Sequence, residues 1–364
     1  MRQSVLFLFT AAGALGVCAS CRCFEPRPPV QKASSVGSES ANSTALGSLL
    51  DASFEAAATE HFVLLHEPGA GYVAGACRTL EYAYGHFYEV FSRAGFDLSR
   101  SKDRLVWICF PRKSSFSKYA LQVEGMDLSW LDGYYSTLTN RVAIVQTDQM
   151  RRREEAAPSS RSAVRVAVAA NRSPRDGVLP MSVTGQRFDV TRLTHEVAHQ
   201  LSFNSGIQKR GVMYPLWVSE GLATNFEFDG SVDADLDHGN TARCNGLLAA
   251  YAAGELVPLR QFVAQTTVPP ETHVGRRYYA QAWGFFQFIL TERPENLRRY
   301  LHRLAQERPD RRDANTMLTE FTEAFGSPET LELSWNTFLS HQAQQALAGR
   351  SAAMRPDAGL APMP

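Results

Sequence analysis

The stretch that decides the fold of this chain is HEVAHQ, residues 195–200, which lies inside the apolar-periodic run 188–203. That periodicity predicts a helix. In a helix, His195 and His199 stand four positions apart, so both imidazoles project from one face and can hold one metal ion. Glu196 lies beside them, where hydrolysis needs a general base. The stretch therefore predicts a catalytic metal centre.

A catalytic zinc ion needs a third protein ligand, and a second motif supplies a candidate. Such a site has three protein ligands and leaves its fourth position to water. The stretch PLWVSEGLA, residues 215–223, places Glu220 21 positions after His199, a distance that allows one loop and a returning helix. Gly221 and Ala223 are small, so we expect this second helix to approach the first closely. An isolated HExxH also occurs by chance on an amphipathic helix, and the second motif makes that reading less attractive.

Together the two motifs resemble the gluzincin zinc metallopeptidases, the clan of thermolysin and the M1 aminopeptidases. They are most similar to a bacterial family of uncharacterised peptidase-like domains in that clan, on the residues HEVAHQ and PLWVSEGLATNFE. The resemblance implies that His195, His199 and Glu220 bind Zn²⁺ and that Glu196 activates water. It also implies an α+β, zincin-like fold, with a small mixed sheet lobe and a mainly helical C-terminal lobe.

The residues that follow the third ligand depart from the pattern of the clan. The clan often has an aspartate one turn after this ligand, or a tyrosine five residues after it, and here Thr224 and Asn225 hold those places. A zinc-bound imidazole usually donates its other N–H to a nearby oxygen. Glu227, Thr224 and Asn225, expected on the same helix as Glu220, are alternative acceptors, and the sequence does not choose among them.

The resemblance also implies a hydrogen-bond donor to the oxyanion that forms during hydrolysis. M1-like members of the clan use a tyrosine at the start of a later helix. In RRYYAQAW, residues 276–283, Tyr279 matches this position best, with Tyr278 and His273 as substitutes. Such a contact contributes roughly 10²–10³ in rate. Aromatic packing at the start of a helix is the alternative reading of Tyr279.

The chain ahead of these motifs divides by composition. Residues 1–20 predict a signal peptide, because a single early arginine precedes an apolar stretch that is short for a membrane span. Residues 21–55 are rich in Pro, Ser, Ala and Gly and predict a disordered linker. Residues 56–345 form the expected metallopeptidase domain, with an Arg-rich inserted loop over 150–183, and 346–364 form a disordered tail.

Export leaves the attachment of the protein open. The expected location is extracytoplasmic, either secreted or periplasmic, or anchored to the cell envelope by a lipid on Cys18 or Cys21, and neither lipidation site is a clean match. Lipidation of Cys21 would leave Cys23 and three further cysteines, which allow three full disulfide pairings in an oxidising compartment. Simple burial of small apolar thiols is the alternative.

Alternating and apolar-periodic segments predict a small sheet ahead of the HExxH helix. Strands are expected at 61–66, at 104–110 and at 141–145, led into by Gly133-Tyr134-Tyr135, with helices at 70–94 and 114–123 between them. In the clan, an edge strand holds peptide substrate by main-chain pairing. By resemblance, residues 133–145 are the candidate edge.

The sequence thus predicts an exported zinc metallopeptidase whose partner is a peptide or protein substrate. Because no acidic motif for a substrate amino terminus precedes HExxH, we favour an endopeptidase. Lys and Arg number 37 and Asp and Glu number 37, so no basic excess indicates a nucleic-acid partner. Two alternatives are an inactive zinc-binding surface protein that binds a partner, and a zinc hydrolase of a non-protein substrate.

Overall fold

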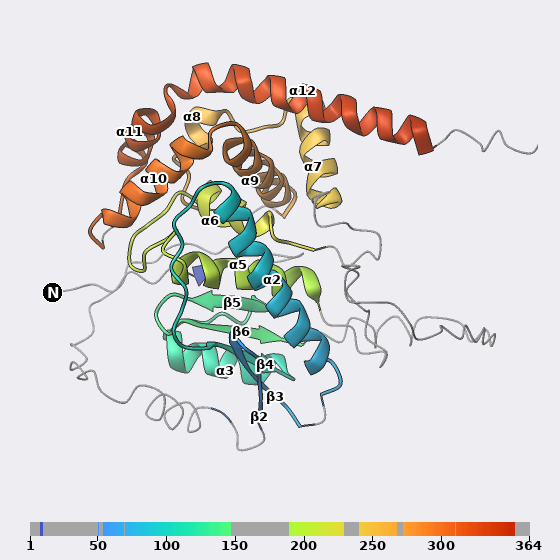
Figure 1. The fold of residues 1–364 in the computed structure, drawn as a ribbon, viewed down its shortest axis with the longest axis vertical. Coiled ribbons are helices and arrows are strands. Elements are labelled where there is room, and N and C mark those ends of the chain that lie inside the picture. Colours follow the sequence, from blue (N-terminus) through green and yellow to red (C-terminus); the bar gives the residue numbers. More distant parts are fainter. Residues whose placement is uncertain are drawn as a thin grey trace, which may run out of the picture.

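The structure is a computed structural model in which the strands, all within the first 145 residues, form one mixed β-sheet (Figure 1). The structure describes residues 8–9, 50, 54–68, 70–146, 189–228, 240–267, 272–309 and 311–353. The strands are β1 (Leu8–Phe9), β2 (Glu55–Ala58), β3 (Phe62–His66), β4 (Leu105–Phe110), β5 (Gly133–Ser136) and β6 (Arg141–Val145). Their spatial order is β1-β5-β6-β4-β3-β2, and the three central strands β6, β4 and β3 run parallel.

Helices cover both faces of the sheet, which is why β4 is buried along almost its whole length. Two of them, α2 (Val73–Arg93) and α5 (Val190–Asn204), pack on one face and share the larger hydrophobic core with it. The other face is covered by α3 (Lys113–Glu124), over a smaller core. The HExxH helix α5 is therefore held between the sheet and the rest of the protein.

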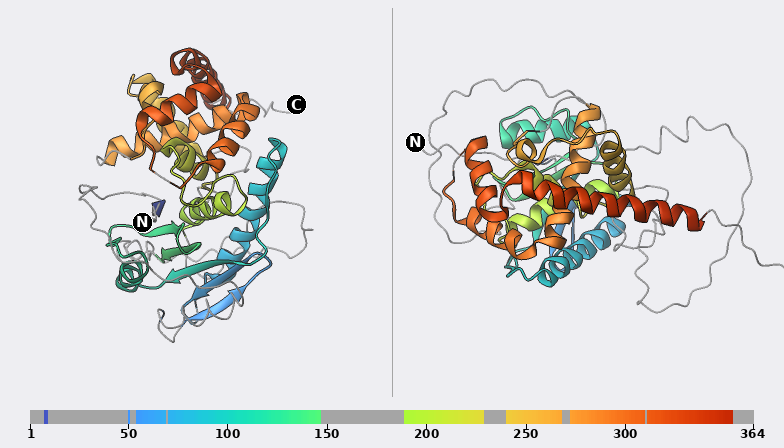
Figure 2. Two further views of the ribbon diagram at one scale, coloured as in Figure 1. Left: turned by 90° about the vertical axis from the view of Figure 1, so that its left-hand side faces the viewer. Right: turned by 90° about the horizontal axis from the view of Figure 1, so that it is seen from above.

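The C-terminal part is helical and lies beyond α5, on the side away from the sheet (Figure 2). Its helices are α6 (Leu216–Thr224), α7 (Thr241–Ala252), α8 (Leu259–Phe262), α9 (Thr272–Glu292), α10 (Pro294–Gln306), α11 (Ala314–Phe325) and α12 (Pro328–Ala353). Trp217 of α6 is fully buried, and its ring centroid lies within 6.0 Å of the ring centroids of Phe285, Tyr300 and Phe321. These contacts fix α6 to α9, α10 and α11.

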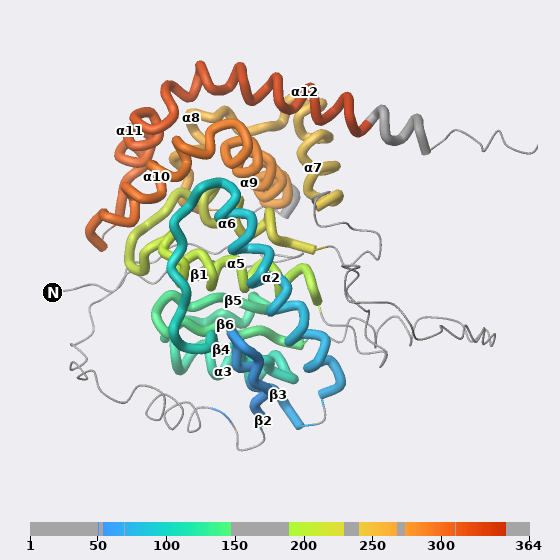
Figure 3. Tube along the Cα trace, in the orientation of Figure 1, coloured from blue at the N-terminus to red at the C-terminus, as the bar shows by residue number. Residues whose placement is uncertain are grey.

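The sheet differs from expectation at both of its edges. Residues 133–136 form a separate strand, β5, which pairs antiparallel with β6, so β6 lies inside the sheet, with β5 and then β1 beyond it. Thr137 to Asn140 make the turn between them, and Asn140 adopts a left-handed conformation with φ 57°. Strand β1 pairs with the outer side of β5 (Figure 3). At the other edge β2 was not predicted, because Glu55–Ala58 carries no alternating apolar pattern.

The expected helices and terminal segments can be compared with the structure only where its residues are described. The expected helices at 70–94, 114–123 and 188–203 are confirmed, with ends shifted by a few residues. Helix α12 continues to Ala353, so residues 346–353 of the expected disordered tail are helical, and residues 354–364 lie outside the described residues. The Arg-rich insertion and most of the predicted leader and linker lie outside the described residues. None of the described helices combines the length and apolar character that a membrane span needs.

The described cysteines have no disulfide partner. Cys77, Cys109 and Cys244 are free thiols, and Cys109 is fully buried in β4. Burial raises the pKa of each of these three thiols. They therefore fit the reading of small apolar residues within the core. Cys18, Cys21 and Cys23 lie outside the described residues.

Candidate metal centre

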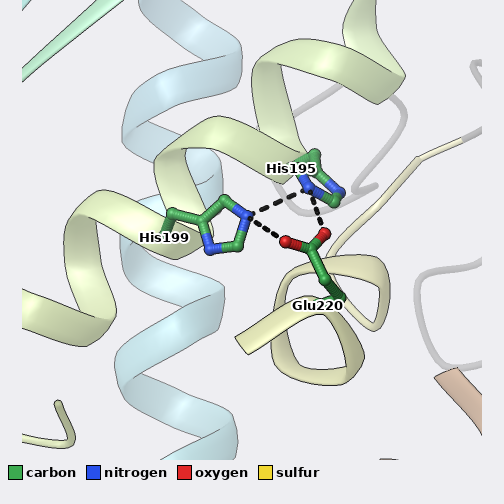
Figure 4. Close-up of side chains that lie close together, drawn as sticks. All are labelled: His195, His199 and Glu220. Carbon is green, nitrogen blue, oxygen red and sulfur yellow. Dashed lines mark hydrogen bonds and ion pairs between the residues drawn. The ribbon is translucent and has the colours of Figure 1, made fainter. Parts of the chain in front are cut away.

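The three predicted ligands meet in the interior, between α5 and α6 (Figure 4). Nε2 of His199 lies 3.1 Å from Nε2 of His195. The Glu220 carboxylate oxygens lie 3.4 Å from Nε2 of His195 and 3.8 Å from Nε2 of His199. A tetrahedral ion with bonds of about 2.0–2.1 Å holds its ligand atoms about 3.3 Å apart. The donor set fits a metal ion. Among the described residues this is the one group of three His, Cys, Asp or Glu that could share one.

Helix α5 brings two of the ligands and the predicted base into the core. The Asp189 side chain caps the helix by accepting a hydrogen bond from the backbone N–H of Arg192 at 3.0 Å. From that start, His195, Glu196 and His199 all fall at positions that are fully buried. Glu196 is adjacent in sequence to a ligand, and so its carboxylate is carried on the ligand helix. Burying charged groups is expensive, and a bound cation would offset part of this cost.

Helix α6 is placed by its contact with α9. A Cβ atom at Gly221 would lie 2.6 Å from the backbone oxygen of Ala282 and 2.8 Å from Cβ of Phe286. The expectation that Gly221 lets α6 approach α5 is therefore wrong, because the close approach is to α9. The adjacent Glu220 is only 2 % exposed and faces the histidines of α5. Glycine at position 221 thus allows α6 to pack closely against α9, and this packing positions the helix that carries Glu220, the candidate third ligand.

Glu227 is the acceptor for the second nitrogen of His195. Its Oε1 atom lies 2.9 Å from Nδ1 of His195. The other two candidates are used elsewhere, since Thr224 donates to the backbone oxygen of Glu220 and Asn225 donates to that of Gly221. Helix α6 ends at Thr224, so Glu227 belongs to the turn after the helix and not to the helix as expected. An Nδ1–H donated to Glu227 leaves the Nε2 lone pair of His195 for a metal ion.

Two residues at the start of α7 hold Glu227, and both were missed by sequence reasoning. Arg243 donates from Nε to Oε2 and from Nη2 to Oε1 of Glu227, each at 2.8 Å. Asn240 donates to Oε2 at 2.9 Å, while its own Oδ1 caps α7. They lie 13 and 16 positions after Glu227, across residues outside the description, and no motif marks them. Only the fold brings them to the site.

Burial and carboxylates set the protonation of the metal-free centre. Burial opposes charge on His195, but the hydrogen bonds that it donates to Glu220 and Glu227 outweigh this effect and raise the pKa of His195 to about 10. Burial and the neighbouring His195 lower the pKa of His199. Burial also raises the pKa of Glu220. Glu227 is equally buried, yet Arg243 and His195 keep its pKa below the usual range. A bound cation would replace the proton on His195.

The glutamine that follows HExxH ties α5 to the sheet. Gln200 is fully buried, accepts from Nε1 of Trp107 at 2.8 Å and donates to the backbone oxygen of Asn140 at 3.0 Å. The Asn140 side chain exchanges hydrogen bonds with Asn204 at the end of α5. Nη2 of Arg210 donates to both of these asparagines, at 2.7 Å and 2.9 Å. This network sets the β5–β6 turn against the ligand helix.

The tyrosines proposed as oxyanion donors occupy different surroundings on α9. Arg243 lies over the ring of Tyr279, with Cζ 5.4 Å from its centroid, which places Tyr279 beside the residue that holds Glu227. Tyr278 packs on Phe262, with 4.9 Å between the two ring centroids. Burial together with the charge of Glu220 raises the pKa of the Tyr278 hydroxyl. The side chain of His273 lies outside what the structure describes.

Comparison with known proteins identifies one family over the metal centre. A family model described as protein of unknown function (DUF1570) matches residues 189–310. No curated protein matches the chain. The match begins at the N-cap of α5 and spans the three candidate ligands, Glu227 and α9. It covers 122 of the 364 residues, about a third of the chain. The chain is therefore similar to this uncharacterised family in the segment that builds the candidate metal centre.

Proposed function

We propose that the protein is a zinc metallopeptidase of the gluzincin type. The observation that carries the proposal is the buried meeting of His195, His199 and Glu220, with Glu196 on the same turn of helix as the two histidines. Two imidazoles and one carboxylate are the ligand set of a catalytic zinc ion with an open position. A structural zinc site is usually closed by four protein ligands, and only three groups come together among the described residues.

The chemistry follows from the position of each side chain. A zinc ion held by the three ligands would act as a Lewis acid on the scissile carbonyl and lower the pKa of water toward about 7. Glu196 takes a proton from the attacking water and passes it to the leaving nitrogen. Tyr279 donates a hydrogen bond to the oxyanion. Glu227 keeps the imidazole of His195 turned toward the ion.

Strand β5 is our candidate for the substrate-binding edge. It lies next to the two-residue strand β1 at one side of the sheet, and it is tied to helix α5 through the β5–β6 turn and Gln200. Leu8 and Phe9 pair with it in antiparallel fashion, which supports its capacity to accept an extended segment. A peptide added in this way gains main-chain hydrogen bonds regardless of its sequence. Strand pairing of this kind does not require a free chain end in the substrate, and so we favour endopeptidase activity.

The proposed setting is extracytoplasmic. It rests on the sequence of residues 1–20, whose charge and apolar pattern favour export. Attachment by a lipid on Cys18 or Cys21 and free secretion are both compatible with that pattern. Membrane fractionation of the native producer, for the unchanged protein and for Cys18→Ser and Cys21→Ser separately, distinguishes them, because only a lipidated protein would leave the membrane fraction when the modified cysteine is replaced.

The activity is tested with the purified protein and a peptide library of unbiased sequence. We expect cleavage by the zinc-loaded protein and its loss in Glu196→Gln, with the zinc content of that variant unchanged. Glu323→Gln is the matched control, because Glu323 is exposed and pairs with Arg303 on the surface of the helical part. Cleavage by Glu196→Gln at the wild-type rate would refute the general-base role. Zinc binding without any cleavage by the wild type would refute the peptidase and favour a partner-binding protein or a hydrolase of another substrate.

A further inference from the structure

Arg243 occupies an energetically costly position that does not stabilise its own helix. It is the third residue of α7, and a cation in the first turn faces the positive end of the helix dipole. Only 21 % of its side chain is exposed, so its guanidinium is also largely withdrawn from water. The two-pronged contact with Glu227 offsets both costs. The position of Arg243 is therefore explained by Glu227 and not by the stability of α7.

Glu227 in turn has one partner in the candidate metal centre and two outside it. Its Oε1 atom accepts from Nδ1 of His195 and from Nη2 of Arg243, and its Oε2 atom accepts from Nε of Arg243 and from Asn240. A carboxylate that accepts four hydrogen bonds from three residues cannot rotate without breaking at least one of them. Without Arg243, the hydrogen bond from Asn240 would be the one remaining restraint in this set besides His195 itself.

We propose that Arg243 is a positioning residue of the metal centre. Its planar guanidinium holds Glu227 in one orientation, Glu227 holds the ring of His195, and the Nε2 atom of His195 is thereby aimed at the ion. Helix α7 thus completes a metal site whose ligands all lie on α5 and α6. The inference rests on the proposed function, because it requires that the site bind zinc, but it does not require that the protein cleave peptides.

The affinity of the site for zinc is the direct readout. Loss of a partner that orients a ligand typically weakens metal binding by 10–100-fold. We expect that range for Arg243→Met, measured by competition between the purified protein and a chromophoric chelator for zinc. Arg243→Lys keeps the charge but cannot form the planar two-pronged contact, so it should restore only part of the affinity. Arg277→Met is the matched control, because Arg277 pairs with Glu255 outside the metal centre and should bind zinc within about twofold of wild type.

A double-mutant cycle separates positioning from an independent effect on the fold. If Arg243 acts through Glu227, Arg243→Met weakens zinc binding in the wild type but adds at most about twofold in a Glu227→Gln background. The double variant also avoids leaving a buried carboxylate without its cation. If Arg243→Met alone loses its near-ultraviolet circular dichroism, Arg243→Lys takes its place in the cycle.

The outcomes distinguish this inference from the proposed function. Zinc binding that is weakened tenfold or more by the Arg243 variant, and not further weakened when Glu227 is already changed, supports it. Wild-type affinity in the Arg243 variant, tighter binding there, or effects that multiply in the double variant would overturn it and leave the zinc peptidase proposal intact. A wild-type protein that binds no zinc would overturn both.

Discussion

Replacement of Gln200 by leucine should lower the free energy of unfolding by about 2–4 kcal/mol. Leucine has a similar volume, so little of the loss comes from a cavity. The substitution leaves the indole N–H of Trp107, which is fully buried, and the backbone oxygen of Asn140 without the partner that each has now. A buried donor left unpaired costs about 1–3 kcal/mol, and an ordinary hydrogen bond contributes about 0.5–1.5 kcal/mol.

The assay is equilibrium unfolding in urea, followed by tryptophan fluorescence and by far-ultraviolet circular dichroism. Gln122→Leu is the matched control, because Gln122 is exposed on α3, and it should change the free energy by less than about 0.5 kcal/mol. Gln200→Leu should also raise the KM for peptides more than it lowers kcat, since the network sets β5 against α5. A loss of stability below about 1 kcal/mol for Gln200→Leu would refute the role assigned to this network.

Three further predictions concern the packing, protonation and chemistry of the site. Gly221→Ala should destabilise the protein by about 1–3 kcal/mol in urea unfolding and weaken zinc binding, because a Cβ there would lie 2.6 Å from the backbone of α9; an unchanged midpoint would contradict this packing. The raised pKa of His195, about 10 against an ordinary 6.5, means that zinc must displace a proton, so the apparent zinc affinity should rise about tenfold per pH unit from pH 7 to 9. The raised pKa of His195 also stabilises the metal-free fold: this stabilisation is fully present below pH 6.5 and is lost as the pH rises through about 10. A zinc affinity that does not change with pH in chelator competition would argue against this protonation of His195. Tyr279→Phe should lower kcat by roughly 10²–10³ with zinc content unchanged, whereas Tyr278→Phe should not, and the reverse pattern would transfer the role to Tyr278.

The three candidate ligands could be predicted from the sequence because each lies inside a local pattern. The spacing of His195 and His199 has a geometric meaning within a single helix, and Glu220 lies in a short apolar helix of its own. The confirmed helices and the parallel strands 62–66 and 105–110 follow for the same reason, since burial alternates along the first strand and is almost continuous along the second.

The rest of the site depends on contacts between distant segments, which no local pattern carries. Arg243 resembles any other arginine in the sequence until the fold brings α7 beside the turn at Glu227. The role of Gly221 was misassigned because a small residue indicates close approach without indicating to which helix. The short strand β5 was absorbed into a longer candidate edge, because the five residues from Ser136 to Asn140 include no glycine or proline to mark the turn.

The central claim is that residues 195, 199 and 220 hold one zinc ion, and metal analysis of the purified protein tests it most directly. Elemental analysis after dialysis against buffer with equimolar zinc should find one zinc ion per chain in the wild type. The same analysis should find a clear loss in His199→Ala and full occupancy in His302→Ala, whose histidine lies exposed on α10. Zinc at one per chain in all three proteins, or in none of them, would contradict the account.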